Sequence, residues 1–148
     1  MIIKELTELF IRDLQRVKKE ISLYQNESDL WVLDKEIYNS AGNLVLHLCG
    51  NLNHFIGATL GNSGYLREKE FSDKYISLDK LHCNIDETIN IVKNCLSNLA
   101  DSEMNAMFPI DVFKKEMTNR YMLLHLYGHL NYHLGQINYH RRLVDNNE

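Results

Sequence analysis

Regularly spaced histidines are the side chains of this chain best suited to chemistry. The chain has 148 residues and seven histidines. Four of these lie near the C-terminal end, at His125, His129, His133 and His140. Steps of four and seven residues return to one face of an α-helix, because each residue turns the helix by about 100°. Imidazole nitrogens bind borderline cations such as Zn²⁺ and Ni²⁺. The spacing therefore predicts a stripe of metal-binding side chains on one helix.

Helix geometry limits which of these histidines can share one ion. Side chains four residues apart can converge, whereas those eight apart are separated by about 12 Å along the axis. Either His125 and His129 or His129 and His133 can therefore form the pair. A third ligand must come from another helix, where His47 and His54 lie seven residues apart on one face. Spacing alone leaves these choices open, and three protein ligands would leave a position free for water, a thiol or substrate.

Two amides are expected to support the histidines. Gln136 follows His133 by three residues and Asn51 follows His47 by four. Each lies about one turn from a candidate ligand, where it can orient an imidazole or a bound water. Cys49 lies about 200° around the helix from His47, so we expect a packed thiol that points away from the ion.

Polar and basic neighbours on the last helix have simpler expected roles. We expect Tyr127 and Tyr132 to pack in the core rather than line a pocket. Arg141 and Arg142 follow His140 at the end of the helix. Basic side chains at that position complement the helix dipole, and they can also bind an anionic thiol.

Four segments with a helical period would position these groups. The first covers residues 2–24, and its apolar stripe consists of Ile3, Leu6, Phe10, Leu14, Val17, Ile21 and Tyr24. The second covers residues 41–60, with Ser40 as its N-cap. The third begins after Ser77 and ends near Leu99, and the fourth follows Thr118 and continues through Leu143. The pattern predicts an all-α four-helix bundle, with residues 1–148 forming a single domain.

The connections between these segments are long. They cover residues 26–39, 61–78 and 100–117. Loops of this length are uncommon in compact domains unless they carry structure or function. We expect short extended segments or 3₁₀ turns packed over one end of the bundle. The alternating residues 108–113 are typical of a short strand.

Glycines interrupt the second and fourth helical segments. They are Gly50, Gly57, Gly128 and Gly135. Each costs up to about 1 kcal/mol relative to alanine inside a helix. We expect them to lie where another helix approaches closely.

Composition excludes several classes of protein. The net charge of −4 argues against a nucleic-acid binder. No apolar run approaches the roughly 18 residues of a membrane span. Glu5 and Glu8 interrupt any signal-peptide core near the N-terminus. The three cysteines show no paired spacing, which is typical of reduced thiols, so we expect a cytoplasmic protein.

Several segments resemble a known superfamily. Residues 124–137 read LHLYGHLNYHLGQI, which resembles the HxxxHxGQI signature of the DinB-like (damage-inducible) superfamily. Residues 39–52 are similar to the second-helix motif of one branch, a domain of unknown function. Residues 67–71, Trp31 and residues 138–142 fit that branch as well. One departure is that Asn53-His54-Phe55 replaces an arginine and an aromatic run.

The resemblance implies more than the spacing does. It implies a DinB-like four-helix bundle, often a homodimer, of a kind that commonly binds a divalent metal, here through His47, His129 and His133. His125 then becomes a lining residue one turn away, and His54 is left out of the ligand set. Related enzymes include bacillithiol S-transferases and mycothiol-dependent maleylpyruvate isomerases.

The expected function is therefore that of a metal-dependent enzyme. A Zn²⁺ or Ni²⁺ ion would activate a low-molecular-weight thiol or a water, for thiol S-transfer or hydrolysis of a small-molecule substrate. The alternative is a non-enzymatic, dimeric stress-response or binding module whose metal site is structural or empty. A third reading is that the histidines hold no metal and only form hydrogen bonds between helices.

Overall fold

The computed structural model describes residues 2–67 and 74–145, and helices account for most of them. The four long helices are α1 (Ile2–Ser22), α2 (Ala41–Leu52), α3 (Leu78–Ser97) and α4 (Asn119–Val144). Three shorter elements are the 3₁₀ helices η1 (Glu27–Trp31) and η4 (Asp101–Asn105) and the π-helix η2 (Asn53–Leu60). The described residues contain no strand, and the prediction of an all-α four-helix bundle is confirmed.

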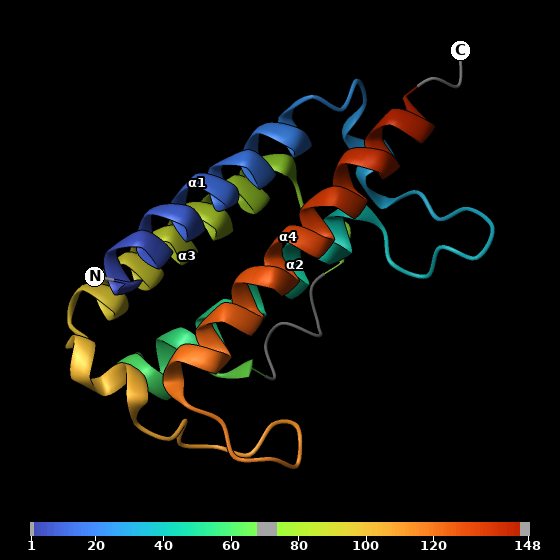
Figure 1. Cartoon of the computed structure of the whole chain (residues 1–148). Helices are drawn as coiled ribbons and strands as arrows, with labels where there is room; N and C mark the ends of the chain where they lie inside the picture. The colour runs from blue at the N-terminus through green and yellow to red at the C-terminus, as the bar shows by residue number, and fades with distance from the viewer. Residues whose placement is uncertain (1, 68–73, 146–148) are drawn as a thin grey trace.

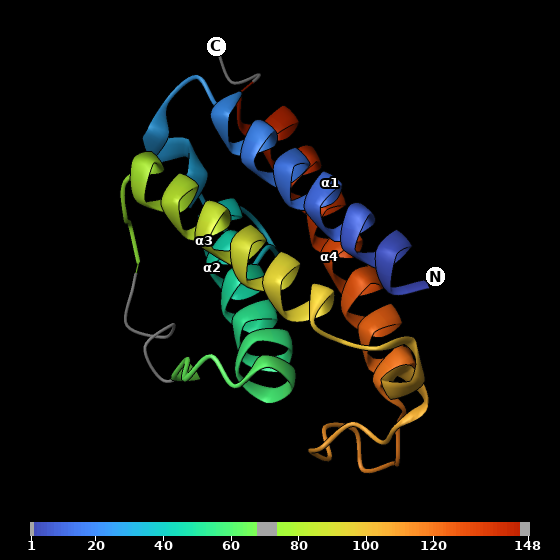
Figure 2. The ribbon, with the colours of Figure 1, turned by 90° about the vertical axis from the view of Figure 1, so that its left-hand side faces the viewer.

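The helices occupy the corners of a square. α1 packs against α3 and α4, and α2 packs against the same two helices, so α1 and α2 lie diagonally opposite. Figures 1 and 2 show that α1 and α4 run in one direction and α2 and α3 in the other. α2 therefore ends, and α3 begins, at opposite ends of the bundle. The long connections follow from this topology, because two of them join diagonal helices and the third joins parallel ones.

Apolar periodicity and polar caps explain the helix positions. The predicted apolar stripe of α1 is buried along its whole length, from Ile3 to Tyr24. The side chains of Ser40, Ser77 and Thr118 accept hydrogen bonds from backbone amides at the starts of α2, α3 and α4. Each cap satisfies an amide that has no partner inside its helix, which sets where the helix begins.

The second predicted helix changes type at its midpoint. It covers residues 41–61 without a break, but residues 53–60 form the π-helix η2. The side-chain amide of Asn53 donates to the Cys49 carbonyl at 2.8 Å and to the Thr88 hydroxyl at 3.0 Å. The Thr59 hydroxyl donates to the His54 carbonyl, five residues earlier, at 3.0 Å. A repeating apolar pattern does not distinguish such wider turns from an α-helix.

The connections contain the expected 3₁₀ turns but not the expected strand. η1 and η4 each form one short 3₁₀ segment. Met107 and Thr118 form an isolated antiparallel bridge, with the Phe108 amide donating to the Met117 carbonyl at 2.7 Å. Residues 108–113 form bends instead of a strand. Their alternating pattern has no neighbouring strand to pair with, so the strand prediction was wrong.

Glycine marks close packing at some positions and not at others. A Cβ atom at Gly57 would lie 2.9 Å from Ile91 on α3, as expected for a close approach. At Gly42, a Cβ would lie 2.7 Å from the Trp31 ring. Gly128 and Gly135, however, have nothing within 4 Å of a Cβ and are exposed on α4. The expectation of close packing there was wrong for the isolated chain.

Membrane insertion finds no support in the helices that the structure describes. None of them combines the length and the apolar character that a bilayer crossing requires.

Replacement of Gly42 tests the packing of η1 on α2. We expect Gly42→Ala to lower the free energy of unfolding by about 1–3 kcal/mol, because the methyl group collides with the Trp31 ring. Chemical denaturation followed by circular dichroism measures the loss. In a Trp31→Leu background the same substitution should cost less, because the obstructing ring is gone. Equal losses in both backgrounds would contradict this account.

Candidate metal centre

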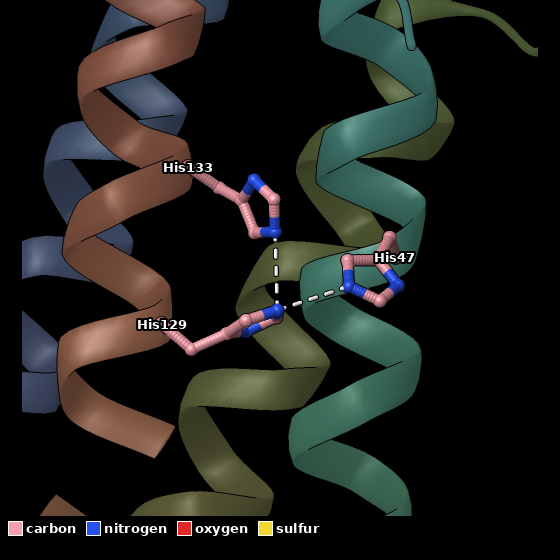
Figure 3. A group of neighbouring side chains, drawn as sticks. All are labelled: His47, His129 and His133. Carbon is pink, nitrogen blue, oxygen red and sulfur yellow. Dashed lines mark hydrogen bonds between the residues drawn. The ribbon is translucent and has the colours of Figure 1, made fainter. Parts of the chain in front are cut away.

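Three histidines from two helices point toward one another in Figure 3. His47 lies on α2, and His129 and His133 lie one turn apart on α4. The His129 Nε2 atom is 3.1 Å from His47 Nε2 and 3.0 Å from His133 Nε2. Within the described residues, these three form the group whose ligand atoms all lie within 4.8 Å of one another. The structure therefore brings together the set that the resemblance implies.

The arrangement of nitrogen atoms is compatible with a shared cation. Two imidazoles bound to one tetrahedral Zn²⁺ at about 2.0–2.1 Å place their nitrogens about 3.3 Å apart. The two observed separations of 3.1 and 3.0 Å are close to this value. A neutral imidazole carries one proton, so the Nε2 atom of His129 can donate to only one of its two neighbours well. The remaining lone pairs are suited to a shared cation.

Burial and neighbours keep His129 neutral. Desolvation, followed by the like charges that His133, His47 and His125 would carry, lowers the pKa of His129 from 6.5 to about 4. Neutral imidazole is the form that binds a metal. The buried Nδ1 atom of His129 has no hydrogen-bond partner in the part of the chain that is described.

Gln136 orients one of the three rings. Its side-chain oxygen lies 2.6 Å from Nδ1 of His133, three residues earlier on α4. An amide oxygen accepts a hydrogen bond from Nδ1–H, so the Nε2 lone pair of His133 is directed at the cluster. The supporting contact expected for Gln136 is present.

The other predicted site residues lie around the cluster or away from it. His125 is exposed and stacks on His129 with ring centroids 6.3 Å apart, so it borders the site. His54 lies on η2 beside Phe55 and outside the three-histidine group. Asn51 is buried, and its side-chain oxygen has no partner among the described residues. Tyr132 is 66% exposed with its ring edge against His133, so the expectation of core packing was wrong for it.

The last histidine of the stripe has a structural role. His140 is buried, with Nδ1 2.6 Å from the Tyr24 hydroxyl and Nε2 2.8 Å from the Val32 carbonyl. Both ring nitrogens therefore have partners that tie α4 to the segment after α1 and to the connection after η1. The packed thiol expected at Cys49 is also found, because Cys49 is buried in the core; that burial raises its pKa to about 11.

A buried carboxylate on the opposite side of α4 was missed by the sequence analysis. Asp13 of α1 is fully buried, and its oxygens accept from the Tyr127 hydroxyl at 2.6 Å and the Asn131 amide at 3.0 Å. Arg12 and Arg16 donate to the same carboxylate at 2.9 and 3.2 Å. The sequence does contain a signal for this buried carboxylate, because an acidic residue, Asp13, lies on the apolar stripe of α1 between Phe10 and Leu14.

This carboxylate cluster positions the histidines indirectly. Tyr127 and Asn131 alternate with His129 and His133 along α4, and residues two apart point in directions about 200° apart on a helix. Holding Tyr127 and Asn131 against α1 therefore turns His129 and His133 toward α2. Seven residues further along each helix, the Glu20 carboxylate accepts a hydrogen bond from the Asn138 side-chain amide at 2.8 Å. The same carboxylate forms an ion pair with Arg141 at 2.9 Å.

Fold and site together define a class. A four-helix bundle with a three-histidine cluster between its second and fourth helices is the arrangement that DinB-like proteins are expected to have. The model of the family described as "Protein of unknown function (DUF1572)" matches residues 2–148. The chain therefore belongs to the DUF1572 family, which is a DinB-like family. No curated protein matches it. Of the resembling segment 67–71, all but Arg67 lies outside the described residues.

Acid titration tests the buried carboxylate. Burial opposes ionisation of Asp13, but hydrogen bonds from Arg12, Tyr127 and Asn131 outweigh it and lower the pKa below the usual value. The unfolded chain therefore takes up this proton first as the pH falls. The stabilisation is complete above the unfolded pKa of about 3.9 and is lost as the pH falls through the lower folded pKa.

We expect Asp13→Asn to lack this acid-dependent loss and to be less stable at pH 7 by about 1–3 kcal/mol. Urea denaturation at a series of pH values measures both effects. Asp86→Asn is the matched control, because its carboxylate is half exposed and pairs with Lys18 on the surface. An unchanged acid profile for Asp13→Asn would contradict the assignment.

Proposed function

We propose that this protein binds one divalent cation through His47, His129 and His133 and uses it to activate a thiol or a water. The observation that carries the proposal is the convergence of three Nε2 atoms from two helices. The preferred ions are Zn²⁺ and Ni²⁺, because the ligands are all imidazoles. Three protein ligands, rather than four, favour a catalytic site over a structural one.

When bound, the cation supplies Lewis acidity that lowers the pKa of a coordinated water or thiol. The chain supplies orientation, because Gln136 fixes the His133 ring and the Asp13 cluster fixes the rotation of α4. His125 borders the site beside His129 and presents an exposed imidazole to an incoming substrate.

The thiol version of the reaction requires a small-molecule thiol. Cys49 is buried with a raised pKa, burial also raises the pKa of Cys95, and Cys83 is exposed on α3. None of the three lies in the group of possible metal ligands found among the described residues. A low-molecular-weight thiol that attacks a small electrophile is therefore the form of S-transfer that fits this chain. Hydrolysis by an activated water is the other form.

Metal analysis of the untagged protein tests the site. We expect about one Zn²⁺ or Ni²⁺ per chain after dialysis against the ion, because three imidazoles hold it together. His133→Ala should remove most of the bound metal, as measured by plasma emission spectroscopy. His82→Ala is the control, because it deletes another histidine, one that contacts Ser22 on the outside of the bundle. Substoichiometric metal in the wild type that does not change in His133→Ala would refute the site.

Gln136 tests whether ring orientation matters to the metal. We expect Gln136→Ala to weaken metal affinity by about 10–100-fold, because the Nδ1 proton of His133 loses its acceptor. Competition with a chromogenic chelator measures the dissociation constant. Gln136→Glu should retain much of the affinity, since a carboxylate also accepts a hydrogen bond from Nδ1–H. Equal affinities for wild type and Gln136→Ala would show that the contact has no such role.

Activity separates the enzyme from a binding module. We expect the metal-loaded protein to accelerate conjugation of a low-molecular-weight thiol to a model electrophile, or hydrolysis of an activated ester. Loss of that rate in His133→Ala but not in His82→Ala would support catalysis. A protein that binds the metal strongly, gains stability from it and shows neither reaction would support the structural alternative.

A further inference from the structure

A row of rings runs along α4 through the candidate metal centre. The rings of His125, His129 and His133 follow one another, with ring centroids 6.3 Å and 4.4 Å apart. Phe113, from the connection before α4, extends the row at one end, 4.7 Å from His125. Tyr132 extends it at the other end, 5.4 Å from His133. The two ligands that α4 contributes therefore lie between ring side chains that are not part of the ligand set.

The side chains that border the ligands are exposed, and we call Phe113, His125 and Tyr132 the aromatic rim. Phe113 is 45% exposed, Tyr132 is 66% exposed, and His125 is exposed as well. His125 and Tyr132 are seven residues apart and lie about 40° and 60° around the helix from His129, in the same direction. Single exposed aromatic side chains need no explanation, but a group of them beside a candidate site marks a place for a ligand.

The fold gives the aromatic rim no evident structural role. Within residues 2–67 and 74–145, neither His125 nor Tyr132 forms a hydrogen bond. His140, in contrast, is a buried histidine of the same stripe with a partner on each ring nitrogen. The rim side chains can therefore contact a bound molecule without breaking a contact that holds the helices together.

The helices around the aromatic rim carry no formal charge other than that of histidine. Residues 37–66 and 121–140 contain no Asp, Glu, Lys or Arg, although 24% of the chain consists of these residues. These two ranges include all three proposed ligands. Lys115, on the connection that carries Phe113, lies over the Tyr121 ring with Nζ 3.0 Å from its hydroxyl. A charged group on a substrate, outside the part that reaches the ion, would find no ion-pair partner on α2, η2 or this part of α4.

We propose that the aromatic rim binds an uncharged, ring-bearing part of the substrate while the reactive group lies at the three-histidine centre. The inference rests on the function proposed above and deepens it, because it names the substrate class of that same site. An aromatic electrophile would suit S-transfer, and an aromatic ester would suit hydrolysis. Phe113 and Tyr132 are then specificity-determining residues, and neither is needed to hold the ion.

The contact area sets the size of the expected preference. A phenyl group that lies against the rim removes roughly 60–90 Å² of apolar surface from water, which corresponds to about 10–50-fold in affinity. A methyl group in the same position is too small to reach both Phe113 and Tyr132. The preference for phenyl over methyl therefore measures the rim separately from the metal.

Binding of two hydroxamates to the metal-loaded full chain tests the aromatic rim. Acetohydroxamate and benzohydroxamate share one metal-binding group and differ in a methyl or a phenyl substituent. We expect the zinc-loaded protein to bind benzohydroxamate about 10–50-fold more tightly, as measured by isothermal titration calorimetry. The ratio of the two affinities for Zn²⁺ in solution is the reference. A para-carboxylate on the phenyl group should remove much of the preference, because no cation on these helices compensates its charge.

Two truncations assign the preference to the rim. Phe113→Ala and Tyr132→Ala should each reduce it by about 3–10-fold, because each removes part of the apolar contact. The zinc content and the circular dichroism spectrum should not change. Tyr139→Ala is the matched control, because Tyr139 is also 66% exposed on α4 but lies two turns further along and contacts Arg142.

The possible results separate the rim from the metal centre. Equal binding of the two hydroxamates, relative to Zn²⁺ in solution, would overturn the rim, and so would a preference that both truncations retain. A tighter complex with the para-carboxylate would overturn the uncharged substrate class. In each of these cases the bound zinc would leave the proposed metal centre intact. A wild-type chain that binds no zinc would overturn both proposals.

Discussion

The rotation of α4 about its own axis is the constraint on which the rest of this structure depends. The helix presents four different faces, and each meets a different environment. Leu126, Leu130 and Ile137 are buried in the core, and Tyr127 and Asn131 bond the Asp13 carboxylate on α1. His129 and His133 face His47 on α2, while the fourth face is exposed. A rotation by one residue, about 100°, would misplace all four faces at once. The polar contacts with α1 oppose that rotation, together with the buried apolar face, and so help to keep His129 and His133 turned toward His47.

The sequence predicted the fold well and the site in part, for identifiable reasons. The apolar stripes and the caps at Ser40, Ser77 and Thr118 depend on local spacing, so they could be read directly. The choice among His125, His129 and His133 could not be read from spacing, because each step of four places two rings on one face. The resemblance to DinB-like proteins selected the set that the structure brings together.

The features that the sequence did not predict depend on residues far away in the chain. Asp13 has partners 114 and 118 residues away, on α4, and the strand-like residues 108–113 lack a neighbouring strand. Gly57 and Gly128 look alike in sequence, yet one meets Ile91 and the other meets open space.

The second helix carries one candidate ligand in its regular part and becomes irregular beyond it. α2 carries His47 in its regular part, and the change to π geometry begins at Asn53, beyond the level of the cluster. The hydrogen bonds of Asn53 to Cys49 and Thr88 fix that transition against α3. His54 lies within the wider turns, so its position relative to His47 differs from the one that an ideal α-helix would give. Two histidines seven residues apart also lie about 10 Å apart along a helix axis, and it is His47 that lies level with His129 and His133.

The two polar contacts between α1 and α4 have the same separation in sequence. Asp13 bonds Asn131 and Glu20 bonds Asn138, and each pair is 118 residues apart. Because the two helices are parallel, the seven-residue step from Asp13 to Glu20 on α1 matches the seven-residue step from Asn131 to Asn138 on α4. One residue inserted between the two contacts, on either helix, would leave at most one pair aligned. A length change that keeps both pairs must therefore fall outside the segments Asp13–Glu20 of α1 and Asn131–Asn138 of α4.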